Sequence, residues 1–194
     1  VIQQLISICA LDLSKGFDKM NHYGLFIKLM DRQIPVQLLQ LLEFWFRSGL
    51  TCVKWGDCFS AFYSQARGIR QGGVLSPYLF ALYIDSVIEK VRRSRVGCEI
   101  RLESVGIIVY ADDILLVAPT VTALQLLLKM CENELNWLAM SINASKSACL
   151  RIGKDYKTVP VCIRTIDGRE IPWQDNVRYL GMHLVANNVF YLLV

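Results

Sequence analysis

The stretch Val105-Gly-Ile-Ile-Val-Tyr-Ala-Asp-Asp-Ile-Leu-Leu-Val-Ala-Pro119 places two adjacent carboxylates, Asp112 and Asp113, between two short apolar runs. Each run is rich in β-branched residues and long enough for one strand, so the stretch predicts a buried hairpin that turns at Ala111-Asp112-Asp113. Such a turn puts both acids at one end of a sheet, where their like charges repel unless a cation holds them ionised. A solvated turn is the alternative, because Asp is common in turns.

A second acidic site decides between these readings. The apolar run from Ile6 to Leu13 predicts a buried strand that delivers Asp12 at its end, directly before Ser14-Lys-Gly-Phe-Asp18. Carboxylates without His or Cys are the hard oxygen ligands that Mg²⁺ prefers. Two such ions about 4 Å apart are typical of phosphoryl transfer.

Two loops complete the set of candidate site residues. Arg67-Gly-Ile-Arg-Gln-Gly-Gly-Val-Leu-Ser-Pro77 is a Gly-rich basic loop that leads into a helix, with Ser76 at the predicted N-cap. Lys146 lies in a later loop, Met140–Lys146. These parts fit a two-metal site for phosphoryl transfer. The two histidines, His22 and His183, are isolated in the sequence and are predicted to be surface or packing residues.

The remaining pattern predicts alternating helices and hairpins. Asn21 caps a helix that ends near Pro35, and the next helix, 36–46, is apolar nearly all round, so we expect it in the core or against a missing partner. The other expected elements are hairpins 51–64 and 161–173, helix 76–93, a helix capped by Thr120 or Thr122 with a buried leucine stripe, strand 148–152 and a final strand 179–184.

Composition narrows the class of protein. With 194 residues, 54% hydrophobic and 20% charged, the chain has the composition of a globular domain, and no charge-free apolar run approaches the roughly 18 residues of a membrane span. The net charge of +4 is only a mild indication of a polyanionic partner. The seven cysteines are scattered and odd in number, which favours buried reduced thiols in a cytosolic or nuclear protein over zinc ligation or disulfides.

Four motifs in this order resemble the palm of a reverse transcriptase, and most closely that of non-LTR (LINE-type) retrotransposons. They are Leu11-Asp-Leu-Ser-Lys-Gly-Phe-Asp18, Arg70-Gln-Gly-Gly-Val-Leu-Ser-Pro77, Tyr110-Ala-Asp-Asp113 and Asn143-Ala-Ser-Lys146, and Tyr179-Leu-Gly-Met182 resembles the segment that grips the primer. Each motif alone is weak evidence for this family, but the four motifs in this order are specific evidence for it. Gly16 stands where the family usually has Ala.

The resemblance implies a role for each matching residue. The expected metal ligands are Asp12, Asp112, Asp113 and the carbonyl of Leu13, which hold two Mg²⁺ ions, with Mn²⁺ as the substitute. Lys146 is expected to protonate the pyrophosphate, and Phe17 to be the aromatic gate against a ribose 2′-hydroxyl. Arg70, Gln71 and Gly72 are expected to lie along the incoming nucleotide and the template.

The resemblance also implies an α+β fold, with an antiparallel palm sheet that places Asp12 and the 110–113 hairpin on adjacent strands and has helices on one face. Residues 1–184 are expected to form a partial palm without fingers and with an incomplete thumb, and 185–194 a truncated continuation. The expected partners are an RNA template, a DNA primer, dNTP and the remaining fingers, thumb and endonuclease segments of a parent polyprotein, with no membrane. This chain alone is expected to have little or no activity.

Two alternatives stay open at this point. Intron-encoded and retron reverse transcriptases share the Gln-Gly-Gly and Tyr-Ala-Asp-Asp motifs. A catalytically silent RNA-binding scaffold built on a palm belongs to another class of function, and the retention of three clustered acids argues against it, because a scaffold gains nothing from such charge.

Overall fold

The protein is described here by a computed structural model, in which residues 5–158, 161–187 and 192–193 are described. The chain forms two compact units, one made of Val1–Gly16 and Ile84–Val194 and the other of Phe17–Tyr83. Nothing in the sequence pattern predicted the second unit as a separate body. Of the expected continuation over 185–194, residues 188–191 and 194 lie outside the described residues.

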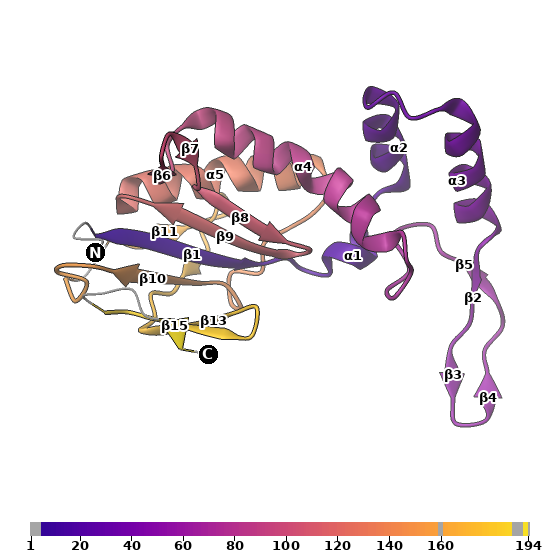
Figure 1. The fold of residues 1–194 in the computed structure, drawn as a ribbon. Coiled ribbons are helices and arrows are strands. Elements are labelled where there is room, and N and C mark those ends of the chain that lie inside the picture. Colours follow the sequence, from indigo (N-terminus) through magenta and orange to yellow (C-terminus); the bar gives the residue numbers. More distant parts are fainter. Residues whose placement is uncertain (1–4, 159–160, 188–191, 194) are drawn as a thin grey trace. The chain divides into compact units, whose positions relative to one another are not determined.

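The centre of the first unit is a four-stranded antiparallel sheet in the order β10-β1-β9-β8 (Figure 1). Its strands are β1 (Ile6–Asp12), β8 (Ile107–Tyr110), β9 (Asp113–Ala118) and β10 (Ala148–Ile152). Tyr110 pairs with Asp113, so the hairpin turns at Ala111 and Asp112, and Asp113 already begins the second strand. Ala111 has a φ of 52°, a left-handed conformation that costs a non-glycine residue about 1 kcal/mol.

The two faces of this sheet are covered differently. Helix α5 (Val121–Trp137) packs across β9 and β1 on one face, and its predicted apolar stripe is buried. On the other face, alternate residues such as Ile8, Leu115 and Leu150 form a core with the hairpin of β13 (Asn176–Tyr179) and β14 (Met182–Val185). The predicted α+β sheet with helices on one face is confirmed, and a β-hairpin covers the second face.

The prediction of one final strand over 179–184 is wrong. β13 ends at Tyr179 and β14 returns antiparallel from Met182, and β14 also pairs with β15 (Leu192–Leu193). Leu180 and Gly181, with φ values of 49° and 81°, form the turn. Two consecutive residues with left-handed φ match the twist of a tight hairpin. The sequence did not predict this turn, because leucine is typical of strands and not of the first turn position.

Short hairpins make up the rest of the sheet structure in the first unit. They are β6 (Glu99–Ile100) with β7 (Glu103–Ser104), and β11 (Ile163–Arg164) with β12 (Glu170–Ile171). The second of these turns at Asp167-Gly168 as predicted, and Gly168 has the left-handed φ of 86° that the turn requires.

The second unit contains three helices and two short strand pairs. The elements are α1 (Gly16–Lys19), α2 (His22–Asp31), α3 (Val36–Ser48), β2 (Leu50–Thr51) with β5 (Tyr63–Ser64), and β3 (Lys54–Trp55) with β4 (Cys58–Phe59). The predicted cap is confirmed, because the Asn21 side chain accepts hydrogen bonds from the N–H groups of Tyr23, at 2.9 Å, and Gly24, at 3.4 Å. Helix α4 (Ser76–Ser94) begins in this unit and ends in the first.

Helix α3 is not buried in the core, so that alternative for its apolar surface is wrong. None of its residues is buried, and Phe44 is 69% exposed. The other alternative, a partner that covers this helix, stays a prediction. Among the residues described, no helix combines the length and the apolar character needed to cross a membrane.

The cysteines are all free thiols, and only three of the seven are buried, namely Cys9, Cys131 and Cys149. Cys9 on β1 lies directly opposite Cys149 on β10. The expectation of buried thiols is wrong for Cys58 and Cys162, which are exposed. The pKa of the Cys9 thiol is raised by its hydrogen bond with Cys149 and by burial, and burial raises the pKa of Cys131 to about 12.

Replacement of Thr120 by Ala is expected to lower the free energy of unfolding by about 1 kcal/mol, because the Thr120 side chain caps α5 by accepting from the Ala123 N–H at 3.0 Å. Thr122 is exposed inside the first turn and is the matched control, for which Thr122→Ala should cost nothing. Urea unfolding of both variants measures the difference. Equal losses in the two variants would contradict the assignment of the cap.

Candidate active site

The acids of β1 and β9 face each other across the sheet. Asp12 is the Cα partner of Asp113. The N–H and the carbonyl of Asp12 bond to a different segment, to Ser147 Oγ at 3.1 Å and the Asn143 N–H at 2.9 Å. Asp12 and Asp113 therefore form a non-hydrogen-bonded pair, in which the Cα atoms of opposite residues are only about 4.5 Å apart and the side chains share one face.

The two carboxylates lie on the face that the β13–β14 hairpin covers. Side chains alternate along a strand, so Asp12 projects with Ile8 and Ala10, and Asp113 with Leu115, all of which pack in or against the core on that face. The pKa of Asp113 is raised, first by partial burial and then by the charges of Asp112 and Asp12. Asp112 and Asp12 thus both lie near enough to Asp113 for their charges to act on it.

The three carboxylates are suitable ligands for a divalent cation, but they do not form a closed metal-binding cluster in the described residues. The three carboxylates at this end of the sheet offer hard oxygen ligands, and a cation beside Asp113 would offset the charges of Asp112 and Asp12 that repel it. Across the described ranges, no three Asp, Glu, His or Cys side chains converge closely enough to form a metal-binding cluster. Leu13 is buried and forms a β-bridge with Ile142 beside the acids.

Lys146 lies on a loop that is fastened to Asp12. The Lys146 N–H donates to the Asn143 carbonyl at 3.2 Å, and the Asn143 N–H donates to Asp12. The Lys146 side chain is exposed. The structure therefore brings five of the predicted site residues to the same end of the sheet: Asp12, Leu13, Asp112, Asp113 and Lys146.

Two residues that support the acids were not predicted for this role. The buried Ser147 accepts the Asp12 N–H, although the two residues are 135 positions apart. The Tyr179 hydroxyl donates to the carbonyls of Asp113, at 3.4 Å, and Ile108, at 3.5 Å. Burial and the charge of Asp113 raise the pKa of Tyr179 to about 12. The sequence indicated only that Ser147 directly precedes a predicted strand and that Tyr179 lies at the end of another.

The other predicted residues, Phe17, Arg70, Gln71 and Gly72, belong to the second unit. The ring of Phe17 is half-buried and stacks on the ring of Phe80, with centroids 4.3 Å apart. This contact supports a packing role for one ring face. Part of the Phe17 side chain is accessible to solvent.

The Gln71-Gly-Gly73 loop is shaped by both glycines. Gly72 has a φ of 79°, and a Cβ on Gly73 would lie 2.7 Å from Ser76 Oγ. The Ser76 hydroxyl donates to the Arg70 carbonyl, which also accepts the Gly73 N–H at 3.1 Å. Ser76 is the first residue of α4, and its side chain closes this loop.

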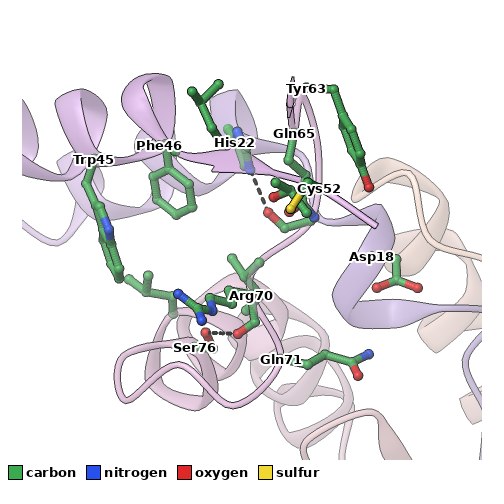
Figure 2. Close-up of a pocket in the computed structure, with 16 residues that line it drawn as sticks. Asp18, His22, Trp45, Phe46, Cys52, Tyr63, Gln65, Arg70, Gln71 and Ser76 are labelled. Atoms are coloured by element: carbon green, nitrogen blue, oxygen red, sulfur yellow. Dashed lines mark hydrogen bonds between the residues drawn. The ribbon is translucent and has the colours of Figure 1, made fainter. Parts of the chain in front are cut away.

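Arg70 and Gln71 line a cavity of about 690 Å³ within the second unit (Figure 2). Figure 2 shows His22, Trp45 and Phe46 on another side of it. The His22 ring lies 4.4 Å from that of Phe46, and its Nε2 is 2.6 Å from the Gly68 carbonyl, so His22 is a packing residue as predicted. A cavity with aromatic walls, the guanidinium of Arg70 and the carboxylate of Asp18 suits a planar ligand with polar groups.

Comparison with known proteins places this geometry in a family. Residues 2–184 match the family described as reverse transcriptase (RNA-dependent DNA polymerase). The chain is 27% identical over 183 residues to the Pol polyprotein of the type-1 retrotransposable element R2 of Nasonia vitripennis, covering 90% of this chain. It is 28% identical over 188 residues to the type-2 element R2DM polyprotein of Drosophila melanogaster, covering 92%.

The fold has a counterpart among solved structures. An apo telomerase from Candida tropicalis, truncated from its C-terminal domain, superposes with a TM-score of 0.68 over 98% of this chain and 35% of the telomerase chain, at 11% identity. That likeness concerns the fold alone. This chain spans 18% of the length of each R2 polyprotein.

The chain belongs to the reverse transcriptase family, and its palm sheet has the right-hand polymerase fold. Its similarity to R2 polyproteins confirms the resemblance to non-LTR retrotransposon enzymes and does not favour the intron-encoded or retron alternative. Reverse transcriptases as a family use divalent metal ions and bind an RNA template with its primer.

Replacement of Asp113 by Asn is expected to stabilise the metal-free chain at pH 7 by a few tenths of a kcal/mol, because it removes one of three repelling charges. The raised pKa means that the folded chain binds a proton here more readily than the unfolded chain, so the parent loses stability as pH rises from the unfolded to the folded pKa.

The advantage of Asp113→Asn should therefore shrink as pH falls through the pKa of Asp113. Urea unfolding in EDTA over a series from about pH 7 down to about pH 3 measures it. A variant less stable than the parent at pH 7 would show that the carboxylate of Asp113 is held by favourable contacts.

Proposed function

We propose that this chain carries the polymerising site of an RNA-templated DNA polymerase of a non-LTR retrotransposon. The observation that supports this most directly is the register that sets Asp12 against Asp113, beside Asp112 and the loop of Lys146. The expected substrates are dNTPs, added to a DNA primer on an RNA template.

The acids would serve as metal ligands. Asp12, Asp112, Asp113 and the carbonyl of Leu13 would hold two Mg²⁺ ions, with Mn²⁺ as the substitute. When bound, these ions supply the positive charge that acidifies the primer 3′-hydroxyl and offsets the charge of the departing pyrophosphate. The chain's own contribution is position, because phosphoryl transfer depends on alignment and electrostatics more than on covalent help from the protein.

Each remaining residue has a task that suits its surroundings. The exposed ammonium of Lys146, on a loop fastened to Asp12, would give a proton to the pyrophosphate oxygen. Arg70, Gln71 and Gly72 would lie along the nucleotide and the template, and the cavity that Arg70 and Gln71 line has the volume of a small-ligand site. Phe17 would select against the ribose 2′-hydroxyl.

Asp112→Asn is expected to lower primer extension roughly a thousandfold, because loss of one ligand removes several kcal/mol of charge stabilisation in the transition state. The assay uses the longest reading frame that contains this chain. Asp155→Asn is the matched control, since Asp155 is an exposed turn residue of the same unit at a φ of 64°, a conformation that Asn tolerates. Retention of a tenth of the parent activity by Asp112→Asn would overturn the assignment.

Phe17→Val should admit ribonucleotides while leaving dNTP use largely intact, because a smaller side chain relieves the clash with the 2′-hydroxyl. The ratio of kcat/KM for dNTP over rNTP measures this. Phe80→Leu weakens the same ring stack from the buried side, so it should lower stability without changing the ratio. If the ratio of Phe17→Val equals that of the parent, Phe17 is a packing residue only.

A further inference from the structure

The C-terminal end of β1 is hydrogen-bonded to the loop that precedes β10, and not to β10 itself. β10 starts at Ala148, which pairs with Ala10. Asp12 lies two residues beyond Ala10, so its outward N–H and carbonyl have no partner on that strand. The loop supplies them, because the Asn143 N–H donates to the Asp12 carbonyl at 2.9 Å and Ser147 accepts the Asp12 N–H at 3.1 Å.

Ser147 is the only side chain in this exchange. Its hydroxyl accepts from Asp12 and donates to the Asn143 carbonyl at 2.8 Å, and the residue is 1% exposed. A hydroxyl that uses both its donor and an acceptor lone pair has a fixed orientation. Water does not compete for the bond, because the residue is buried.

We propose that Ser147 is a positioning residue that holds Asp12 and Lys146 in one fixed arrangement, an inference that rests on the proposed function. On one side it fixes the main chain of Asp12. On the other it closes the turn that carries Lys146, since the N–H groups of Lys146 and Ser147 both donate to the Asn143 carbonyl, at 3.2 and 3.0 Å, which also accepts the Ser147 hydroxyl.

This arrangement links the two chemical roles. The residue that begins the reaction as a metal ligand and the residue that ends it as a proton donor are held by one hydroxyl. Positioning errors of about 1 Å cost roughly a hundredfold in rate, so a small relaxation of this link is expected to show in kcat. KM for dNTP should change little, because Ser147 is buried and its hydroxyl is bonded to Asp12 and Asn143.

Three variants separate positioning from simple stability. Ser147→Ala removes the hydroxyl and leaves the Asp12 N–H without its partner. Ser147→Thr keeps the hydroxyl. Ser145→Ala is the matched control, because Ser145 is an exposed serine of the same loop whose hydroxyl donates to Asn143 Oδ1 at 2.8 Å.

The first measurement needs no activity. Amide hydrogen exchange, resolved by NMR on this 194-residue chain, should be at least about tenfold faster at Asp12 in Ser147→Ala, with the amides in the middle of β1 and β9 unchanged. Ser147→Thr and Ser145→Ala should match the parent. Unchanged exchange at Asp12 in Ser147→Ala would overturn the proposal, and so would a uniform rise across the sheet, which indicates global destabilisation.

The second measurement is primer extension by the longest reading frame that contains this chain, with kcat per active site from single-turnover titration. Ser147→Ala should lower kcat roughly tenfold to a hundredfold, with KM for dNTP within about twofold of the parent, and Ser147→Thr should restore kcat.

A parent-like kcat in Ser147→Ala overturns the positioning role while the proposed function stands. A parent that extends no primer overturns the proposed function, and the positioning role falls with it.

Discussion

The pairing of Asp12 with Asp113 is the constraint on which the site depends. It follows from the register of β1 and β9. A shift of this register by one residue would move Asp12 to the opposite face of the sheet. Like charges directly opposite each other destabilise an antiparallel pair. The sheet tolerates this pair because long ladders on both sides fix the register: β1 also pairs with β10 over five residues from Ile6 to Ala10, and β9 pairs with β8.

The backbone around the acids is held by groups that are far away in the sequence. The Tyr179 hydroxyl bonds to carbonyls on both strands of the acidic hairpin, and Ser147 bonds to Asp12 from the opposite edge. Each contact comes from a residue that follows the acid it contacts by more than sixty positions. Ser147 and Tyr179 thus support the acids from the C-terminal half of the chain. We therefore expect an ordered site to require that half.

Local signals predicted most of the fold, and the failures have physical causes. The acidic hairpin, the buried face of α5 and the Asn21 cap depend on short-range periodicity and capping, and the structure confirms them. The turn at Leu180-Gly181 was missed because leucine rarely takes a left-handed φ. The apolar sequence of α3 left two alternatives open, burial in the core or cover by a partner, and the exposure of the helix rules out only the first. The roles of Ser147 and Tyr179 depend on tertiary contacts, which no local pattern reports.

The facing thiols of Cys9 and Cys149 have a chemical consequence. The Cys149 N–H and carbonyl bond to Pro172 and Gln174, so Cys9 and Cys149 are also a non-hydrogen-bonded pair, whose Cα separation of about 4.5 Å falls within the range of disulfides. A bond between them would covalently join the strand of Asp12 to the strand that follows Lys146. Oxidants and disulfides react with the thiolate, and the raised pKa of Cys9 keeps it protonated at neutral pH. Burial therefore makes this pair resistant to oxidation in spite of its favourable geometry, whereas the exposed Cys58 and Cys162 are the thiols open to alkylation.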